Sequence, residues 1–515
     1  MTVEPDRGTG PDRRARGGQR VLLGVDIGTS ITKATVFDGT GKILAGAERP
    51  TRLVHSAGGR VEQDSDEVTR SVGEVLREVT ATLGPGHAPE LLAVTGQGDG
   101  CWLVDGDGRP ARAAISWMDG RAGDLVTRWA AEGVTDAVYR VNGDAMFPGA
   151  LSSILAWLDE HEPAVLDRSA SAQSCTGMVL NRLTGLCALD PSEASLPFGD
   201  GAGGYSTDVL DLFGLGHRAR LLPRVVTPVP RARLDAGGAE LTGLPEGLPV
   251  SGGPFDLPAC AIGAGVSELG DGVLTIGTTL ACQVLVDRVD TSGEVAGMHL
   301  AVPSGSAGGI DRWLRALPAM VGTASLDWVL AMLGVAHDAI GAALADTQPG
   351  AGGVEMLPYL APSGERAPFV DAAARGQLTG LSLTARREDF VRAVCEGIAF
   401  AARDCFAGTE LTGRLFVCGG GTRSPQWLQV FADVLGRPLH LTRAVGIGAR
   451  GAVLCHLRAA GEDPDPGQWT ATTQVVQPDP AAGRVYDHLF ARYRAHREAA
   501  QPLWSRPDLI SGGAR

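Results

Sequence analysis

Two segments of the chain repeat one pattern of hydrophobic and polar residues. Residues 21–38 read VLLGVDIGTSITKATVFD, and residues 272–287 read GVLTIGTTLACQVLVD. Each is an apolar run rich in β-branched residues, a Gly-Thr turn and a second such run, which predicts a β-hairpin. Glycine permits the tight turn, and the turn exposes backbone N–H groups and hydroxyls that can bind an anion. Two such hairpins facing each other would hold a polyphosphate, so the pattern favours a two-lobed enzyme that handles ATP.

Apolar residues at helical spacing predict helices between the strands. The clearest runs from about residue 65 to 83, with Asp64 or Ser65 as its N-cap. Further helices are expected at about 120–132, 151–160, 322–333, 386–406 and 485–503, and after the glycine clusters near 420 and 448. Strands mixed with helices in two similar halves indicate an α/β protein with two lobes, each a mixed β-sheet flanked by helices.

The chain divides into three expected parts. Residues 1–20 are rich in Pro, Gly and Arg, which predicts a disordered tail. Residues 21–249 are expected to form the N-terminal lobe, with the sugar site and the first phosphate hairpin. Residues 250–515 are expected to form the C-terminal lobe, with the catalytic and nucleotide-binding residues, after a Gly/Pro-rich linker that ends near Val250.

Composition narrows the class of protein. A chain of 515 residues with 44% hydrophobic residues is long enough for two large domains. The net charge of −14 and the lack of a basic, aromatic stretch argue against nucleic-acid binding. No apolar run has the length of a membrane helix, and the N-terminus lacks the core of a signal peptide. Nine cysteines without a CxxC pair argue against zinc or disulfides. We expect a cytoplasmic protein that binds neither nucleic acid nor membrane; a homodimer is compatible with the sequence, which does not decide it.

Nine motifs, taken in their order along the chain, resemble the FGGY family of carbohydrate kinases. They are DIGTSITK at 26–33, GGRVEQD at 58–64, VTGQGDG at 94–100, SWMDGRA at 116–122, GGPFD at 252–256, IGTT at 276–279, SGERAP at 363–368, RGQLTGLSL at 375–383 and CGGGTRSPQW at 418–427. The resemblance implies the actin-like ATPase (ribonuclease H-like) fold. It also implies an ATP-dependent transfer of a phosphoryl group to a small sugar or polyol.

The first hairpin carries groups that suit phosphate and a metal ion. Those that can meet phosphate oxygens are Gly28, Thr29, Ser30 and Lys33. Asp26, at the end of the strand, can hold Mg²⁺ directly or through water, because Mg²⁺ prefers oxygen ligands. A plain hairpin with a surface lysine would show the same residues. The matching Gly277 and Thr278 of the second hairpin favour the phosphate interpretation.

Asp256 is the expected catalytic residue. Phosphoryl transfer to a sugar hydroxyl needs a base beside the attacking oxygen, together with positioning and charge neutralisation. Asp256 follows GGPF in a tight loop between the expected lobes, and it matches the aspartate that is the family's catalytic base. Aspartate before an apolar run also often caps a helix. The two roles are compatible, and we favour catalysis.

The expected substrate-binding residues come from three motifs. They are Gln97, Gly98, Asp99, Trp117, Asp119, Arg121 and Phe255. Gln97 and Asp99 project from a glycine loop that lets a ligand approach closely, and Trp117 can pack on a carbon face. Asp119 and Arg121 can bind hydroxyls or form a structural ion pair with each other, and the sequence leaves these alternatives nearly equal.

The nucleotide is expected to lie against a run of glycines. The matching residues are Gly419, Gly420, Gly421, Ser424 and Gln426. A glycine-rich turn with Ser424 before a helix that starts at Pro425 is the alternative interpretation. Two places depart from the family pattern. Ile154 stands where the family usually carries lysine, and Ala444 and Val445 stand where it has an acidic residue.

The substrate is narrowed by resemblance within the family. Many xylulose kinases have Met-His where this chain has Gly98 and Asp99, which argues against D-xylulose. GQGDG at 96–100, DPSE at 190–193 and FGD at 198–200 resemble the erythritol kinase branch, and GGPFD is similar in L-xylulose kinases. We expect an ATP-dependent kinase of a terminal hydroxyl of such a polyol or ketose. The alternatives are a D-xylulose kinase, a non-catalytic sugar- or nucleotide-binding regulator, and an actin-like phosphohydrolase.

Overall fold

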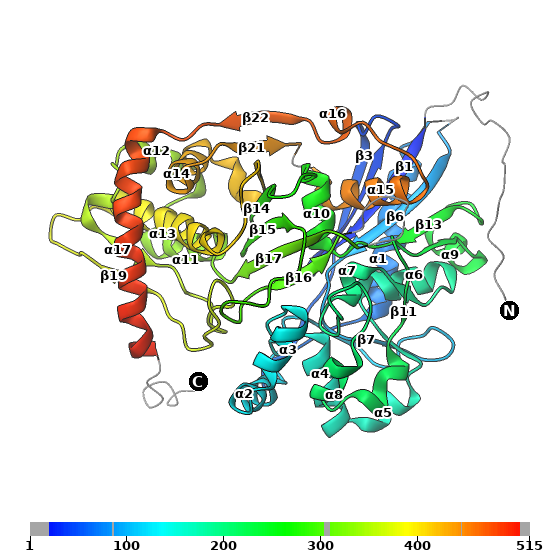
Figure 1. Cartoon of the computed structure of the whole chain (residues 1–515). Coiled ribbons are helices and arrows are strands. Elements are labelled where there is room, and N and C mark those ends of the chain that lie inside the picture. Colours follow the sequence, from blue (N-terminus) through cyan, green and yellow to red (C-terminus); the bar gives the residue numbers. More distant parts are fainter. Residues whose placement is uncertain (1–19, 85–86, 303–309, 444, 505–515) are drawn as a thin grey trace.

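The computed structural model describes residues 20–84, 87–302, 310–443 and 445–504 (Figure 1). The tail expected at the N-terminus and Ala444 therefore lie outside the described residues, apart from Arg20. The described chain forms two lobes, each built around a large mixed sheet (Figure 1). This arrangement agrees with the α/β organisation that the sequence predicts.

A six-stranded sheet forms the centre of the N-terminal lobe, in the order β12-β13-β6-β1-β2-β3. Its strands are β1 (Val21–Ile27), β2 (Ile31–Phe37), β3 (Ile43–Pro50), β6 (Pro89–Gly96), β12 (Arg231–Arg233) and β13 (Pro249–Gly252). β1 runs antiparallel to β2, as the hairpin pattern predicts, and parallel to β6. Helix α1 (Ser65–Ala81), capped by Asp64, covers one face, and α15 (Ile447–Ala459) covers the other, so β1 is apolar on both faces.

Smaller elements extend the N-terminal lobe. Helices α2 (Gly123–Ala131), α3 (Val134–Asn142), α4 (Leu151–His161), α5 (Pro163–Arg168) and α8 (Thr207–Leu212) contribute to a separate hydrophobic core. The remaining elements are α6 (Cys175–Thr184), α7 (Pro191–Ala194), α9 (Ala236–Thr242), β4 (Val54–Ser56), β5 (Arg60–Gln63), β7 (Trp102–Val104), β8 (Ala114–Ile115), β9 (Ser171–Gln173), β10 (Ala188–Leu189) and β11 (Arg224–Val225).

A seven-stranded sheet forms the centre of the C-terminal lobe, in the order β16-β17-β15-β14-β20-β21-β22. Its strands are β14 (Gly272–Ile276), β15 (Leu280–Val286), β16 (Met298–Ala301), β17 (Trp313–Ala319), β20 (Leu415–Cys418), β21 (Leu439–Thr442) and β22 (Thr472–Val476). The helices are α11 (Thr323–Leu333), α12 (Ile340–Ala345), α13 (Arg387–Ala407), α14 (Pro425–Leu435), α16 (Pro466–Trp469) and α17 (Pro480–Trp504); β18 (Glu355–Leu357) pairs with β19 (Gln377–Thr379). The second predicted hairpin is therefore β14–β15.

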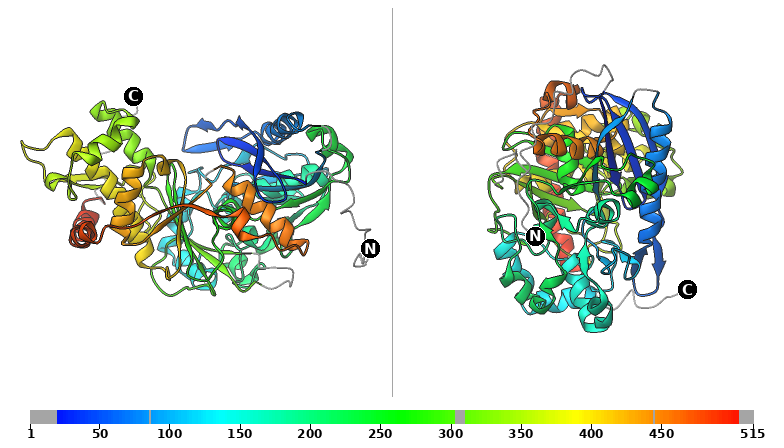
Figure 2. Two further views of the ribbon diagram at one scale, coloured as in Figure 1. Left: turned by 90° about the horizontal axis from the view of Figure 1, so that it is seen from above. Right: turned by 90° about the vertical axis from the view of Figure 1, so that its right-hand side faces the viewer.

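Two crossing helices, α10 (Asp256–Ala264) and α15, join the lobes. A Cβ atom on Gly263 would lie 2.0 Å from the Ile447 carbonyl oxygen, and one on Gly451 would lie 1.9 Å from that of Ala259, so the helices approach backbone to backbone. In Figures 1 and 2, α15 lies beside the sheet of the N-terminal lobe, while β22 and α17 return to the other lobe. The expected boundary at residue 250 falls inside β13, which pairs with β6. The chain crosses to the second sheet through α10, so Asp256 starts the crossing helix.

Within the described ranges, no single helix is long and apolar enough to cross a membrane. The residues Thr323–Leu333 and His337–Ala345 meet the length and composition criteria only as a pair that is bent by 99°.

Candidate active site

Asp256 is the first residue of α10 and lies where the lobes meet. Phe255 occupies the N-cap position and makes no side-chain capping hydrogen bond, so Asp256 does not serve as the helix cap. The N-terminal lobe holds the loop before it by three hydrogen bonds: the Gly253 amide to the Val94 carbonyl (2.8 Å), the Thr95 hydroxyl to the Pro254 carbonyl (2.6 Å) and the Phe255 amide to the Ser192 hydroxyl (2.9 Å). The backbone that carries Asp256 is thus fixed to the N-terminal lobe.

Three carboxylates influence one another at this point. Burial, together with the charges of Asp26 and Asp99, raises the pKa of Asp256 to about 8. Burial also raises the pKa of Asp26 and of Asp99 to about 6, opposed by Lys33 in the first case and by Arg366 in the second. Carboxylates that are withdrawn from water without close ion-pair partners are costly, and such clusters are typical of functional sites.

Asp26 lies at the end of β1, beside the start of α15. Its register partner on β2 is Lys33, whose charge favours the ionised carboxylate. A Cβ atom on Gly448 would lie 2.4 Å from Asp26 Oδ2, so the glycine leaves the space that the carboxylate occupies. The N-terminal turn of a helix carries partial positive charge, which stabilises an anion there. Asp26 therefore has two sources of positive potential but no ion pair with a described residue.

Thr29 ties the first hairpin to Gln63 and Trp117. The Gly28 amide closes the turn on the Ile31 carbonyl (3.0 Å). This N–H group is therefore occupied, whereas the sequence predicts that it is free to bind phosphate. The Thr29 carbonyl accepts a hydrogen bond from Gln63 Nε2 (2.8 Å), and its hydroxyl accepts one from the indole N–H of Trp117 (2.9 Å). Ser30 and Lys33 are exposed beside it. The turn is therefore held rigidly while Ser30 and Lys33 face solvent.

The second hairpin is oriented by α11. Its Gly277 amide closes a turn that is one residue shorter, on the Thr279 carbonyl (3.1 Å). The carbonyls of Gly277 and Thr278 accept hydrogen bonds from the first amides of α11, at Thr323 (2.8 Å) and Ala324 (3.3 Å). The side chain of Thr278 is exposed. The turn's carbonyls are thus occupied by the helix, while the exposed Thr278 hydroxyl remains available to a ligand.

Gln97, Gly98 and Asp99 follow β6 but differ in their surroundings. Gln97 is 3% exposed, and its Nε2 donates to Gln63 Oε1 (2.8 Å), which extends the network that reaches Thr29. A Cβ atom on Gly98 would lie 1.3 Å from the Phe255 ring, so only glycine fits there. Asp99 has a φ of 51° and is partly exposed. Of the three, Asp99 is the residue whose side chain is open to a ligand.

Asp119 and Arg121 form the structural ion pair that the sequence leaves open. Arg121 Nε lies 2.8 Å from Asp119 Oδ1, and Arg121 Nη2 lies 2.6 Å from Glu62 Oε1. The second Asp119 oxygen accepts the Val61 amide (2.6 Å). Both residues are buried. Asp119 is therefore saturated by protein partners, which leaves little for a sugar hydroxyl.

The glycine run at 419–421 packs on the second hairpin. Cβ atoms on Gly419 and Gly421 would lie 2.4 and 2.2 Å from atoms of Ile276, whereas one on Gly420 would meet nothing within 4 Å. Gly420 therefore borders open space, as a nucleotide site requires. Ser424 caps α14 by accepting the Trp427 amide (3.3 Å), which confirms the helix-start alternative for this residue, and Gln426 is exposed next to it.

Further residues at the site had no role assigned from sequence. Glu365 and Arg366 belong to the quoted motif SGERAP, and Arg366 is close enough to Asp99 to affect its pKa. Asp190 and Glu193 belong to DPSE, and burial raises the pKa of both carboxyl groups, helped at Glu193 by the charge of Asp190. Glu193 and Asp99 line a cavity of about 20 Å³ behind Phe255, which has room for one water molecule. In the sequence these residues stand out only as parts of motifs, and only the fold brings them close to Asp99.

The two departures from the family pattern differ in position. Ile154 is fully buried in α4 within the core of the smaller helices, so an apolar side chain suits it. Val445 is 63% exposed just before α15, and Ala444 lies outside the described residues.

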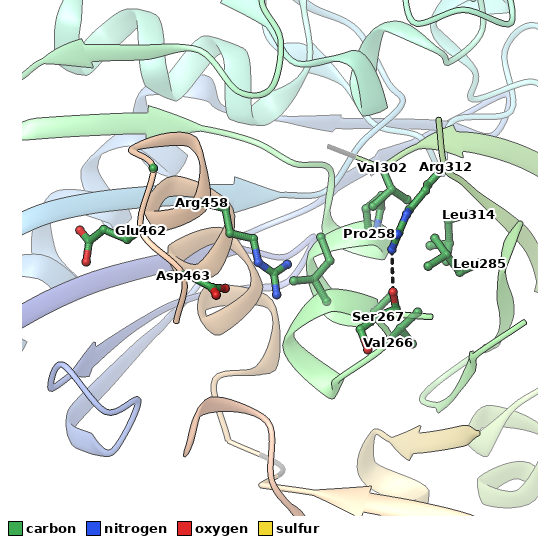
Figure 3. A pocket seen from close by; sticks show the side chains of 13 residues that line it. Pro258, Val266, Ser267, Leu285, Val302, Arg312, Leu314, Arg458, Glu462 and Asp463 are labelled. Atoms are coloured by element: carbon green, nitrogen blue, oxygen red, sulfur yellow. Dashed lines mark hydrogen bonds between the residues drawn. The ribbon is translucent and has the colours of Figure 1, made fainter. Parts of the chain in front are cut away.

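A larger cavity, of about 390 Å³, lies on another face of the crossing helices (Figure 3). Pro258 and Ile262 of α10, Leu314 of β17 and Arg458 of α15 help to line it, and Arg312 donates to the Ser267 carbonyl there (2.7 Å). None of the residues expected to bind substrate or nucleotide lines this cavity. Size alone therefore does not locate the active site.

Comparison with known proteins gives the family. The N-terminal domain of the FGGY family of carbohydrate kinases matches residues 21–263, and its C-terminal domain matches residues 287–460. The erythritol kinase of Brucella abortus (strain 2308) is 33% identical over 96% of this chain and 98% of its own. The probable L-xylulose kinase of Pasteurella multocida (strain Pm70) is 26% identical over 92% and 97%.

Solved structures show the same fold. The xylulose kinase of Rhodospirillum rubrum superposes with a TM-score of 0.83 at 30% identity, over 95% of this chain and 100% of that one. A ligand-bound xylulose kinase from Lactobacillus acidophilus gives a TM-score of 0.86 at 22% identity, over 94% and 99%. The expected two-lobed actin-like ATPase fold is confirmed. The chain belongs to the FGGY family of carbohydrate kinases, and it is thus an ATP-dependent phosphotransferase that acts on an alcohol group of a small sugar or polyol.

Proposed function

We propose that this kinase phosphorylates a terminal hydroxyl of a short polyol or ketose of the erythritol or L-xylulose type. The relatives that carry these two names support the substrate class. The observation that carries the proposal is the pair of carboxylates at the cleft. Asp256 starts the crossing helix, and Asp99 lies near enough for its charge to raise the pKa of Asp256.

Asp256 is the proposed general base. Its carboxylate accepts the proton of the substrate hydroxyl as that oxygen attacks the γ-phosphorus of ATP, and the bond to the β–γ bridging oxygen breaks to release ADP. The raised pKa suits a base, because a carboxylate with a higher pKa holds the transferred proton more firmly. Closure of the lobes would exclude water, which would otherwise accept the phosphoryl group.

The C-terminal lobe and the two hairpins are proposed to hold ATP. Ser30, Lys33 and Thr278 offer exposed hydroxyls or charge to the phosphates. Gly420 borders the open space for the nucleoside. The enzyme is proposed to act in the cytoplasm, where ATP is available.

Mg²⁺ is proposed to bind near Asp26. Asp26 and Asp256 are carboxylates whose charges oppose each other, and a divalent cation relieves this repulsion. Among the described residues, no three His, Cys, Asp or Glu side chains form a ready-made metal cluster. This fits Mg²⁺, which is usually held by one or two carboxylates together with substrate phosphates and water. When bound, the ion neutralises charge on the phosphates.

A coupled ADP-release assay with a panel of acceptors tests the proposal. We expect erythritol or L-xylulose to give a higher kcat/KM than D-xylulose or glycerol, because Asp99 accepts hydrogen bonds that a Met-His pair would not. A clear preference for D-xylulose would identify the alternative kinase and show that Gly98 and Asp99 were misinterpreted. ADP release that no acceptor increases would indicate a phosphohydrolase, and no ADP release would indicate a binding protein.

A further inference from the structure

One arginine of the C-terminal lobe reaches into the sugar site of the N-terminal lobe. Arg366 follows Glu365, whose Oε1 accepts hydrogen bonds from the backbone amides of Met320 (2.6 Å) and of Arg366 itself (2.8 Å). These bonds fix the backbone at the point where the side chain departs. The guanidinium carbon then lies 3.8 Å from the centroid of the Phe147 ring and 5.9 Å from that of Trp117, both in the N-terminal lobe.

The guanidinium of Arg366 has aromatic neighbours but no hydrogen-bond acceptor. It forms neither an ion pair nor a side-chain hydrogen bond with a described residue, although its backbone amide is bonded. Arg366 is partly exposed and lines a small cavity together with Phe147. An arginine offers five N–H donors and no acceptor. The side-chain donors of Arg366 therefore have no acceptor among the described residues.

Asp99 carries the complementary group, and its chain segment packs beside the two aromatic rings. The next residue, Gly100, packs on the segments that carry both aromatic rings. Its amide donates to the Gly149 carbonyl (3.0 Å), and a Cβ atom on Gly100 would lie 3.1 Å from the backbone nitrogen of Trp117. The charges of Asp99 and Arg366 act on each other, yet the two groups are too far apart for an ion pair. A carboxylate acceptor and a guanidinium donor thus lie near each other without forming an ion pair.

A polyol can bridge such a pair because each of its hydroxyls both donates and accepts hydrogen bonds. Of two neighbouring hydroxyls, one can donate to the carboxylate while the other accepts from the guanidinium. We infer that Arg366 is a specificity-determining residue that crosses the cleft and, with Asp99, binds a vicinal diol of the substrate. The inference rests on the proposed function and adds a contact from the second lobe, so that diol binding favours the closed arrangement of the lobes.

The test pairs a substitution with the loss of the vicinal diol. Arg366→Gln and Arg366→Lys are compared with wild type, and Arg375→Gln is the matched control, because Arg375 lies in the same loop but donates to the Ala372 and Ala374 carbonyls. Each protein is assayed with erythritol and with 1,4-butanediol, which keeps the terminal hydroxyls but has no vicinal diol. Arg366→Gln is expected to lower kcat/KM for erythritol roughly tenfold to hundredfold, because a hydrogen bond to a charged group is lost. The loss for butanediol should be much smaller, with KM for ATP unchanged.

Each outcome decides the matter. An equal loss for both acceptors, or a loss shared by Arg375→Gln, would mean that Arg366 only packs on Phe147 and Trp117, and the inference would be wrong. Unchanged erythritol turnover in Arg366→Gln would overturn it as well. If that variant does not fold, Arg366→Lys, which keeps the charge but offers fewer donors in another geometry, decides by the same comparison. Wild-type enzyme that phosphorylates no polyol would instead refute the proposed function itself.

Discussion

Asp99 and Asp119 stand twenty residues apart in similar sequence settings, yet the fold gives them opposite surroundings. Asp119 is buried, and its oxygens are occupied by Arg121 and the Val61 amide. Asp99 is partly exposed, and its nearest cation, Arg366, does not reach ion-pair distance. A carboxylate whose oxygens are occupied by protein partners stabilises the fold, whereas one without an ion-pair partner is free to bind a ligand. Asp256 resembles Asp99 in this respect, so substitution of these residues should affect catalysis, whereas substitution around Asp119 should affect stability.

The largest expected effect is the loss of catalysis in Asp256→Asn. Asparagine keeps the shape of the side chain but cannot accept the hydroxyl proton, so kcat should fall on the order of a hundredfold to ten-thousandfold. Binding of the polyol, measured by calorimetry, should persist. Near wild-type kcat in a folded Asn variant would remove Asp256 from the proposed mechanism.

Arg121→Met should reduce stability rather than catalysis. It leaves Asp119 buried without its ion-pair partner, and breaking a buried pair costs about 3–5 kcal/mol. Urea denaturation measures the loss, and kcat is measured where the variant is still folded. A rise in KM for the polyol with unchanged stability would place Arg121 in the substrate site and erase the contrast with Asp99.

These residues also show what the sequence reveals and what it hides. The hairpins, the helices and the cap at Asp64 follow from local periodicity and turn chemistry, and all of them occur in the structure. The second partner of Asp119 does not follow, because Val61 lies far away in the chain and only the fold brings its amide to the carboxylate. Arg366 was visible only as part of a motif, since its position beside Phe147 requires the two lobes to meet.

The pH dependence of activity should follow the carboxylates that lack close partners. With a pKa of about 8, Asp256 is protonated below that value, so kcat/KM should rise with pH and level off above about 8. The groups that act on Asp256 are Asp26, Asp99 and Glu193, with Lys33 acting through Asp26. A profile that is flat from pH 6 to 9 would contradict the desolvated base.

Stability should show the opposite trend with pH. The folded pKa of Asp256 exceeds its value of 3.8 in the unfolded chain, so the folded state binds more protons between these values. Its ionisation therefore costs stability as pH rises from about 4 to about 8. Asp256→Asn should become progressively more stable than wild type over this range, as urea denaturation would show. A constant difference would mean that Asp256 is well solvated.

The smallest expected effect tests the two hairpins against each other. Thr278→Val removes an exposed hydroxyl and should raise KM for ATP about tenfold, the range expected for one hydrogen bond to a charged group. KM for the polyol should not change. Thr29→Val is the comparison, because its hydroxyl is bonded to Trp117 and its loss should affect the sugar side instead. Calorimetry that shows unchanged ATP affinity and a large loss of polyol affinity in Thr278→Val would reverse the assignment.

The most direct measurement follows the phosphoryl group itself by phosphorus NMR. Wild-type enzyme with ATP, Mg²⁺ and erythritol should form ADP and a phosphomonoester in equal amounts, while Asp256→Asn should form almost none and Arg121→Met, assayed while folded, should form both. Free phosphate in place of the phosphomonoester, or equal product from the wild type and Asp256→Asn, would contradict the assignment of catalysis to the unpaired carboxylates.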